Sequence, residues 1–197
     1  MRIPALFRTL LSIMLPSSIV LPSSIMLLAV FALTACSPAA APAAPTAASP
    51  EWFAIQMTDV TTGQPFSIND FKGKVVLLET MATWCPTCWQ QELQVKKLHG
   101  LLGNTPDLVE ISLDVDSHED EALLKDFAKT GDMDWRFAVA PIKVQHDLGN
   151  LYSAEYLNPP LVPMLIIDRA GSVYNLPYGL KSAEQLQKTL EPYLKSQ

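Results

Sequence analysis

The stretch VVLLETMATWCPTCWQQELQVKKLHGLLG, residues 75 to 103, decides the fold that the sequence predicts. Its first part, Val75–Met81, is a near-continuous apolar run, as expected for a strand that is buried on both faces of a sheet. From Pro86 to Leu102 the apolar side chains recur with helical spacing, and Gly103 ends the pattern. Proline suits the first turn of a helix because its missing N–H would have no partner there. The stretch therefore predicts a buried strand, a short loop and a helix.

Two cysteines stand where the loop meets this helix. Cys85 lies at the helix N-terminus, where unpaired backbone N–H groups and the helix dipole favour a thiolate. Cys88 lies one turn further in, close enough to form a disulfide but more shielded. In thiol–disulfide exchange one sulfur attacks or is attacked, and a second sulfur resolves the mixed disulfide. The spacing therefore matches a two-electron exchange.

Other uses of the cysteine pair fit the sequence less well. A disulfide that closes so small a loop restricts the unfolded chain very little, so it would add little to the stability of the fold. A zinc site needs four ligands, and the sequence has no second Cys pair or His pair at a suitable spacing. A peroxiredoxin-like peroxidase would need Thr or Ser three residues before its reactive cysteine, where Ala82 stands. We expect no metal and no cofactor beyond the redox-active disulfide itself.

The rest of the chain after residue 50 alternates predicted strands and helices. We expect a β-hairpin around Thr62-Gly63, strands at 108–115 and 135–140, a helix within 118–131, short helices within 143–156, a strand–turn–strand unit at 164–179 and a closing helix at 182–197. Strands that alternate with helices, followed by a hairpin and a helix, indicate an α/β fold. The expected architecture is a central mixed β-sheet flanked by helices, with an N-terminal β-hairpin.

Over nearly all of residues 51–197 the chain resembles the thioredoxin superfamily, and within it the membrane-anchored branch that includes the TlpA and ResA proteins. The resemblance rests on TGQPFSINDFKGKVVLL, TWCPTC, DVDSHEDEALLKDFAKTG and LVPMLIIDRAGSV. It implies a thioredoxin-like fold with a central helical insertion. It also implies a cis-proline facing the two cysteines. By position that proline is Pro163, and Val162 before it would present its backbone to a partner's chain.

Glu79 lies in the middle of an apolar strand, where burying an acid is costly unless it is paired or functional. Thioredoxins carry a buried acid six residues before the first cysteine, and Glu79 stands six residues before Cys85. The resemblance implies that Glu79 accepts and returns the proton of Cys88. Burial would raise its pKa toward neutrality, which suits that task. The alternative is a glutamate at a strand end that turns to solvent.

Three residues beside the cysteines are expected to contact a client protein or tune the site. Pro86 and Thr87, between the cysteines, set the reduction potential, which varies widely in this fold. Thr87 can offer its hydroxyl to the Cys85 sulfur, which would favour the reduced form. Trp84 would shield Cys85 and offer a surface to the partner. With Val162, these residues form the predicted client contact.

The N-terminal region predicts export and lipidation. Arg2 and Arg8 precede a long apolar run, and LTAC at 33–36 resembles the lipobox of bacterial lipoproteins. We interpret residues 1–35 as a signal peptide and Cys36 as the lipidated residue. Residues 36–50 form an Ala/Pro-rich tether that carries the domain 51–197. The alternative is an uncleaved signal anchor with an idle cysteine. The expected location is a membrane, facing the periplasm or extracytoplasmic space.

The charge balance limits the partners. The chain has 14 Lys and Arg and 20 Asp and Glu. Both cationic residues of the first 35 belong to the signal peptide, so the rest is strongly acidic. This argues against nucleic acid as a partner. The expected partners are client proteins with disulfides or thiols and a membrane electron donor that recharges the protein.

Two functions stay open at this point. The preferred one is a specific disulfide reductase, and the resemblance implies apocytochrome c thiols (cytochrome c maturation) or copper-site cysteines as clients. The alternative is a Sco-like copper chaperone without turnover. That role needs two cysteines and a distal histidine, and soft ligands select Cu(I). Sco-like chains space their cysteines by three residues, however, and His146 stands in a different context from the Sco histidine.

Overall fold

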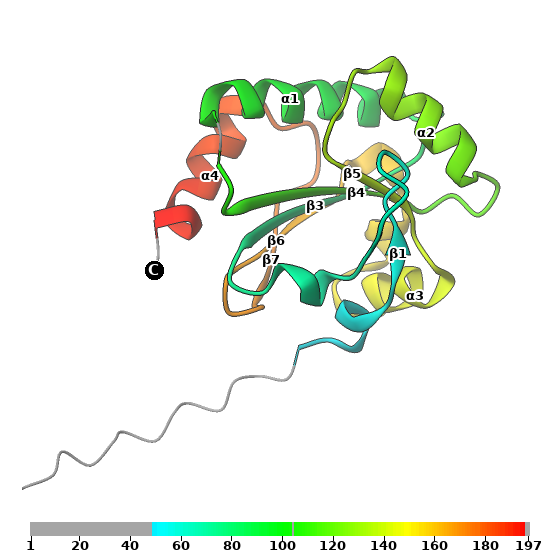
Figure 1. The fold of residues 1–197 in the computed structure, drawn as a ribbon, viewed down its shortest axis with the longest axis horizontal. Helices are drawn as coiled ribbons and strands as arrows, with labels where there is room; N and C mark the ends of the chain where they lie inside the picture. Colours follow the sequence, from blue (N-terminus) through cyan, green and yellow to red (C-terminus); the bar gives the residue numbers. More distant parts are fainter. Residues whose placement is uncertain (1–48, 104, 196–197) are drawn as a thin grey trace, which may run out of the picture. The chain divides into compact units, whose positions relative to one another are not determined.

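The computed structural model describes residues 49–103 and 105–195 of the chain (Figure 1). The expected signal peptide, Cys36 and all but the last two residues of the tether lie outside the described residues. Within the described part, no helix is long and apolar enough to cross a membrane.

The described chain forms seven strands, four α-helices and four short 3₁₀ helices. The strands are β1 (Met57–Thr58), β2 (Pro65–Phe66), β3 (Val75–Met81), β4 (Leu108–Asp114), β5 (Arg136–Val139), β6 (Met164–Ile167) and β7 (Val173–Asn175). The α-helices are α1 (Pro86–Leu102), α2 (Glu121–Thr130), α3 (Ile142–Leu151) and α4 (Ala183–Lys195). The 3₁₀ helices are η1 (Glu51–Ala54), η2 (Ile68–Phe71), η3 (Ala154–Leu157) and η4 (Pro159–Leu161).

Five strands form one mixed sheet with β3 at its centre. The strand order is β5-β4-β3-β6-β7. Strands β3, β4 and β5 run parallel, whereas β6 is antiparallel to both β3 and β7. Strands β1 and β2 form the separate antiparallel hairpin that the sequence predicts, although each is only two residues long. The α/β class and the mixed sheet are confirmed.

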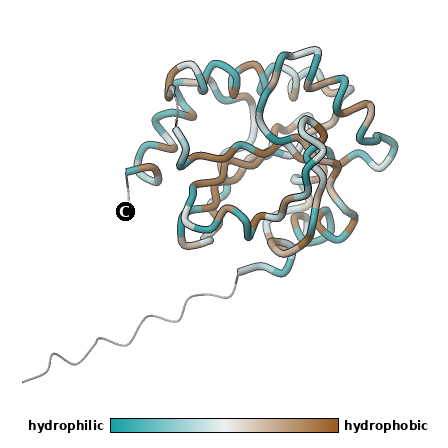
Figure 2. The backbone as a smooth tube through the Cα atoms, viewed as in Figure 1, coloured by the Kyte–Doolittle hydropathy of each residue, from teal (hydrophilic) through white to brown (hydrophobic). Residues whose placement is uncertain are grey.

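Alternation along β3 distributes its side chains between two cores. Leu77 and Met81 belong to the core that also holds apolar side chains of α1, α2 and α4, whereas Val76 and Leu78 belong to the core that holds those of α3, η1 and η2. Figure 1 shows α1, α2 and α4 over one face of the sheet and α3 over the other. Hydrophobic residues follow the central strands (Figure 2). Glu79, two residues from Leu77 and Met81, therefore points from β3 toward the α1 side.

The local signals around α1 act as the sequence predicts. Cys85 caps the helix, because its Sγ accepts a hydrogen bond from the Cys88 backbone N–H at 3.2 Å. Pro86 occupies the first turn. Gly103 ends the helix with φ of 65°, a left-handed value that glycine adopts without steric cost. Strand β3 and helix α1 thus fix the two ends of the loop that carries Trp84 and Cys85.

Candidate active site

The two cysteines of the α1 N-terminus form a disulfide. The Cα atoms of Cys85 and Cys88 lie 5.2 Å apart, within the range that a disulfide requires. Both residues are only 1% exposed. The structure therefore shields Cys85 as well as Cys88. A client reaches this disulfide only if neighbouring groups on the surface give way.

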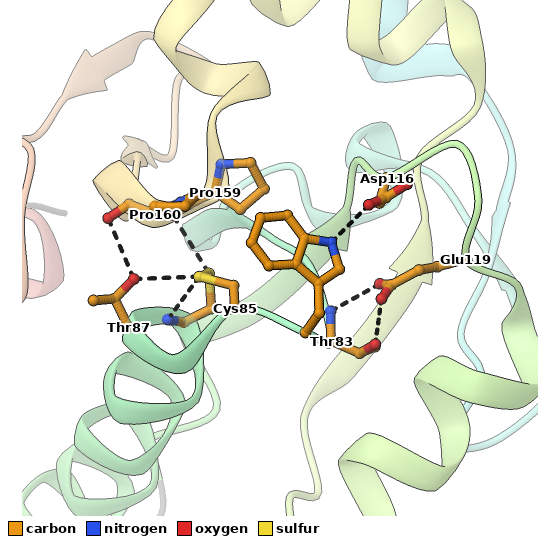
Figure 3. Close-up of a disulfide and its surroundings, with 9 residues drawn as sticks. Thr83, Cys85, Thr87, Asp116, Glu119, Pro159 and Pro160 are labelled. Carbon is orange, nitrogen blue, oxygen red and sulfur yellow. Dashed lines mark hydrogen bonds between the residues drawn. A yellow bond between two sulfur atoms is a disulfide. The ribbon is translucent and has the colours of Figure 1, made fainter.

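The Thr87 hydroxyl lies between the disulfide and the chain segment opposite (Figure 3). Its Oγ1 is 3.2 Å from Cys85 Sγ, which confirms the predicted contact, and 3.3 Å from the carbonyl oxygen of Pro160. A disulfide sulfur carries no proton, so Thr87 is the donor. One hydroxyl proton serves two acceptors, and a thiolate at Cys85 would attract it more strongly than a disulfide sulfur does.

Carbonyl groups of η4 face the cysteines. Cys88 Sγ lies 3.3 Å from the Pro159 carbonyl oxygen, and the Pro160 carbonyl faces Thr87. A Cys88 thiol, once formed by reduction, would have an acceptor in Pro159. The family resemblance implies that Pro163 also faces the cysteines, and this stays a prediction.

The expected cis bond at Pro163 is a point on which the prediction was wrong. The described residues contain no cis peptide bond, and Val162 adopts φ of 50° and ψ of 58°. This left-handed conformation is unusual for a β-branched residue. It turns the chain from η4 into β6, where the Pro163 carbonyl accepts a hydrogen bond from the Thr80 N–H at 3.1 Å. Pro163 is thus a buried residue that directly precedes β6.

Val162 does not present a free backbone in this structure. Its N–H donates to the Pro159 carbonyl at 2.8 Å, and its carbonyl accepts from Lys181 Nζ at 3.1 Å. Lys181 is fixed in turn by the buried Gln91 of α1, whose side chain accepts from the Lys181 N–H at 2.8 Å and donates to the Lys181 carbonyl at 3.2 Å. Backbone groups that are already paired would have to be released before a client chain could use them.

The loop before Cys85 is held by acidic side chains of the segment that follows β4. The Trp84 indole N–H donates to Asp116 at 2.6 Å, although the residue is 56% exposed. The Thr83 N–H donates to Glu119 at 2.8 Å and its hydroxyl donates to the same carboxylate (Figure 3). Burial raises the pKa of the nearby Asp114 to about 8, and Glu119 adds to the rise. The loop that positions Cys85 is therefore tied to the central insertion.

Glu79 is buried, as the interpretation that it exchanges a proton with Cys88 requires. It is 2% exposed and lies in β3 between Ser112 of β4 and Met164 of β6. Burial raises its pKa well above the usual 4.5, and the neighbouring Glu92 raises it further, while Lys181 opposes the rise. The alternative of a solvent-facing glutamate is wrong. Its part in proton transfer stays a prediction.

A second buried acid, Glu92 of α1, was missed by the sequence analysis. The residue is fully buried, and burial raises its pKa to about 7. Its position could have been found, because four residues after Cys88 and three before Val95 it lies on the apolar face of the helix. Lys181 and Gln91 had no comparable signal, since their importance depends on a contact between segments 90 residues apart.

The described residues contain no cluster of three or more His, Cys, Asp or Glu side chains that could hold a metal ion. The arrangement around the disulfide instead supplies a donor to one sulfur, an acceptor for the other and a buried pair of carboxyl groups. These are the requirements of thiol chemistry that moves protons with electrons.

Comparison with known proteins agrees with this chemistry. The family model described as Redoxin matches residues 39–187, well over half of the chain. The chain belongs to the Redoxin family. A relative of this Redoxin chain is the thiol-disulfide oxidoreductase ResA of Bacillus cereus, which is 27% identical over 132 residues, 66% of this chain and 69% of the relative. The thioredoxin-like protein YneN of Bacillus subtilis is 24% identical over 131 residues, covering 66% and 71%.

Solved structures resemble this Redoxin chain in fold. A thiol:disulfide interchange protein of Chlorobium tepidum aligns with a TM-score of 0.58 at 19% identity, covering 71% of this chain and 92% of that one. The exposed lipoprotein thioredoxin Etrx1 of Streptococcus pneumoniae aligns with a TM-score of 0.53 at 21% identity, covering 70% and 98%. The thioredoxin-like fold and the ResA-like relationship that the sequence motifs indicated are confirmed.

Proposed function

We propose that this protein is a membrane-anchored, extracytoplasmic reductase that transfers electrons from a membrane donor to disulfides in client proteins. The coarser activity is that of a thioredoxin-like thiol–disulfide oxidoreductase, the activity for which its ResA relatives are named. The observation that carries the proposal is the Cys85–Cys88 disulfide at the N-terminus of α1. There the dipole and unpaired N–H groups favour the thiolate that exchange requires.

The reaction uses the two sulfurs in sequence. The reduced Cys85 thiolate attacks a client disulfide, which forms a mixed disulfide and releases one client sulfur. Cys88 loses its proton and attacks Cys85 Sγ, which closes the protein's own disulfide and releases the second client sulfur. The client gains two electrons, and the protein is oxidised to the form that the structure describes. Thr87 would stabilise the Cys85 thiolate, and Glu79 would exchange the proton of Cys88.

Location and clients are the finer parts of the proposal. The signal-like N-terminus and the lipobox-like LTAC support export and a lipid anchor at Cys36. Etrx1, a structural neighbour, is itself named as an exposed lipoprotein thioredoxin. In a compartment that oxidises thiols, a reductase needs a source of electrons, so we assign recharging to a membrane dithiol donor. The proposed clients are apocytochrome c thiols or copper-site cysteines held as disulfides.

The test of the exchange uses two cysteine variants of the full chain. Cys85→Ser should abolish reduction of a protein disulfide such as that of insulin. The Cys88→Ser variant should still attack the client disulfide through Cys85 but should accumulate a mixed disulfide. This would be visible as a covalent complex with the client that dithiothreitol cleaves. Turnover in either variant at the unsubstituted rate would exclude the assigned roles.

The anchor needs a separate test. The unsubstituted protein should incorporate radiolabelled palmitate in cells, whereas Cys36→Ser should incorporate none and should leave the exchange rate of the purified protein unchanged. Equal labelling of the two proteins, or no labelling of either, would refute lipidation at this residue, and the second result would favour an uncleaved signal anchor.

A further inference from the structure

Two glutamates from different elements meet in the core beneath the disulfide. Glu79 comes from the central strand β3, and Glu92 comes from the helix α1 that covers this face of the sheet. They are 2% and 0% exposed, and their carboxyl groups lie within hydrogen-bonding reach of each other. With both groups ionised, none of the four carboxylate oxygens has a hydrogen-bond partner of normal geometry among the described residues.

The pair lies next to the inner cysteine along the helix. Glu92 follows Cys88 by four residues, so the two side chains share one face of α1 and are separated by about one helical turn, roughly 5 to 6 Å along the axis. Cys88 and the α1 residue Val95, three positions after Glu92, both belong to the core on this side of the sheet. Over such a distance a proton passes through a bridging water molecule, because direct transfer needs hydrogen-bond contact of about 2.6 to 3.2 Å.

Few groups of opposite charge face the pair. Lys181 attracts Glu79, but its Nζ donates to the carbonyl oxygens of Val162 and Gly179 at 3.1 and 2.7 Å. Ser112 of β4 and Trp135 approach Glu92 and favour its charged form, and the Trp135 indole donates to Ser112 Oγ at 3.0 Å. One partly compensated charge can be tolerated in this buried setting, whereas two adjacent carboxylates, both ionised, would repel each other at high cost.

We propose that Glu79 and Glu92 hold one proton in common and serve Cys88 as a single group. A pair that keeps one proton has a proton to give and a place to accept another at the same pH. A single glutamate can do only one of these at a time. This inference rests on the proposed function, because only thiol–disulfide exchange requires Cys88 to lose and regain a proton.

The pair acts once in each half of the cycle. When the mixed disulfide resolves, Cys88 gives its proton to the pair. Its electron pair then forms the Cys88–Cys85 bond while the Cys85–client bond breaks, and the client sulfur leaves with the bonding electrons and takes a proton from water. When an external dithiol reduces the protein, one of its thiolates attacks Cys85 Sγ, and the Cys88–Cys85 bond breaks toward Cys88, whose sulfur takes its proton from the pair. The second sulfur of the dithiol then attacks the first, which closes the dithiol's own disulfide and releases Cys85 as a thiolate.

The first measurement is the titration of glutamate side-chain carboxyl carbons by ¹³C NMR in the oxidised full chain. Glu92→Gln keeps the size of the side chain but removes its charge. The last titration step of Glu79 should then fall by about one pH unit or more, the coupling expected for interacting carboxyl groups. Glu79→Gln should lower the titration of Glu92 in the same way, which provides a second variant if the first fails to fold. The exposed Glu155→Gln is the matched control.

The second measurement is the rate at which dithiothreitol reduces the disulfide, as a function of pH. The ratio of the Glu92→Gln rate to the wild-type rate cancels the ionisation of the reagent. It should fall at least threefold as pH rises above neutrality, because Glu79 alone has lost the proton that Cys88 needs. The same ratio for Glu155→Gln should stay constant.

The outcomes separate the two proposals. An unchanged titration of Glu79 in Glu92→Gln, or a rate ratio independent of pH, would overturn the shared proton while leaving the exchange activity intact. A wild-type protein that reduces no protein disulfide would refute the proposed function, and the carboxyl titration, which needs no client, would still report whether the two glutamates share a proton.

Discussion

Replacing Glu92 by Gln should make the protein more stable at alkaline pH, although it removes a native side chain. Glu92 is fully buried, and burial raises its pKa from 4.5 to about 7. A carboxyl group with a raised pKa contributes most to stability below its unfolded pKa. It loses that contribution as pH rises through the folded pKa, because the unfolded state ionises first. Glutamine has nearly the same shape and no ionisation to lose.

The size of the effect follows from the shift. Each pKa unit corresponds to about 1.4 kcal/mol, so the rise of Glu92 from 4.5 to about 7 is worth about 3 kcal/mol over the full range. Most of the interval between the unfolded and folded pKa values of Glu92 lies between about pH 5 and about pH 8. Between these two pH values the free energy of unfolding of the wild type should therefore fall by roughly 2 to 3 kcal/mol more than that of Glu92→Gln. Comparing the two pH values cancels any effect of the substitution that does not depend on pH.

The assay is urea unfolding of the oxidised protein, followed by tryptophan fluorescence at both pH values, with Glu155→Gln as an exposed control. From about pH 5 to about pH 8 the free energy of unfolding of the wild type should fall by roughly 2 to 3 kcal/mol more than that of Glu92→Gln. Parallel curves for the two proteins would refute the reasoning, because they would mean that Glu92 ionises as easily in the folded chain as in the unfolded chain.

Two further predictions concern the disulfide and the core. Thr87→Val should make the reduction potential of the disulfide more negative by about 30 to 60 mV in glutathione or dithiothreitol buffers, because a hydrogen bond to a thiolate worth about 1.5 to 3 kcal/mol is lost. An unchanged potential would mean that the Thr87 hydroxyl donates its hydrogen bond to the Pro160 carbonyl in both the oxidised and the reduced protein. Trp52→Ala should cost about 3 to 5 kcal/mol of unfolding free energy, since Trp52 is fully buried. The half-exposed Trp84→Ala should cost much less in the same urea titration, and equal losses would contradict the assigned burial.

The fold was predictable because its signals are local. The apolar run Val75–Met81, Pro86 in the first helical turn and Gly103 at the helix end each fix a boundary through the chemistry of neighbouring residues, and β3 and α1 have those bounds. The Thr62-Gly63 turn likewise predicts the hairpin. Motifs add the order of the elements, since TWCPTC between a buried strand and a helix is specific to the thioredoxin-like arrangement.

The candidate site was predictable only in part. Cys85, Thr87 and Cys88 lie within one helical turn, so their mutual contacts follow from helix geometry. Glu79 can be recognised because it is an acid within an apolar strand. The cis bond expected at Pro163 was wrong. The backbone of this segment depends on how η4 packs over the disulfide, and a left-handed Val162 has no signal in the neighbouring residues.

The sequence by itself determined the strand, the helix and the cysteine pair at their junction, because short-range backbone preferences and hydrophobic periodicity are sufficient for those. Only the tertiary structure decided that Glu79 and Glu92 meet. Their contact depends on how α1 lies across β3, which is set by the packing of many apolar side chains at once. The same packing removes both carboxyl groups from water, and this desolvation, not the residue types alone, allows the pair to hold a proton for Cys88.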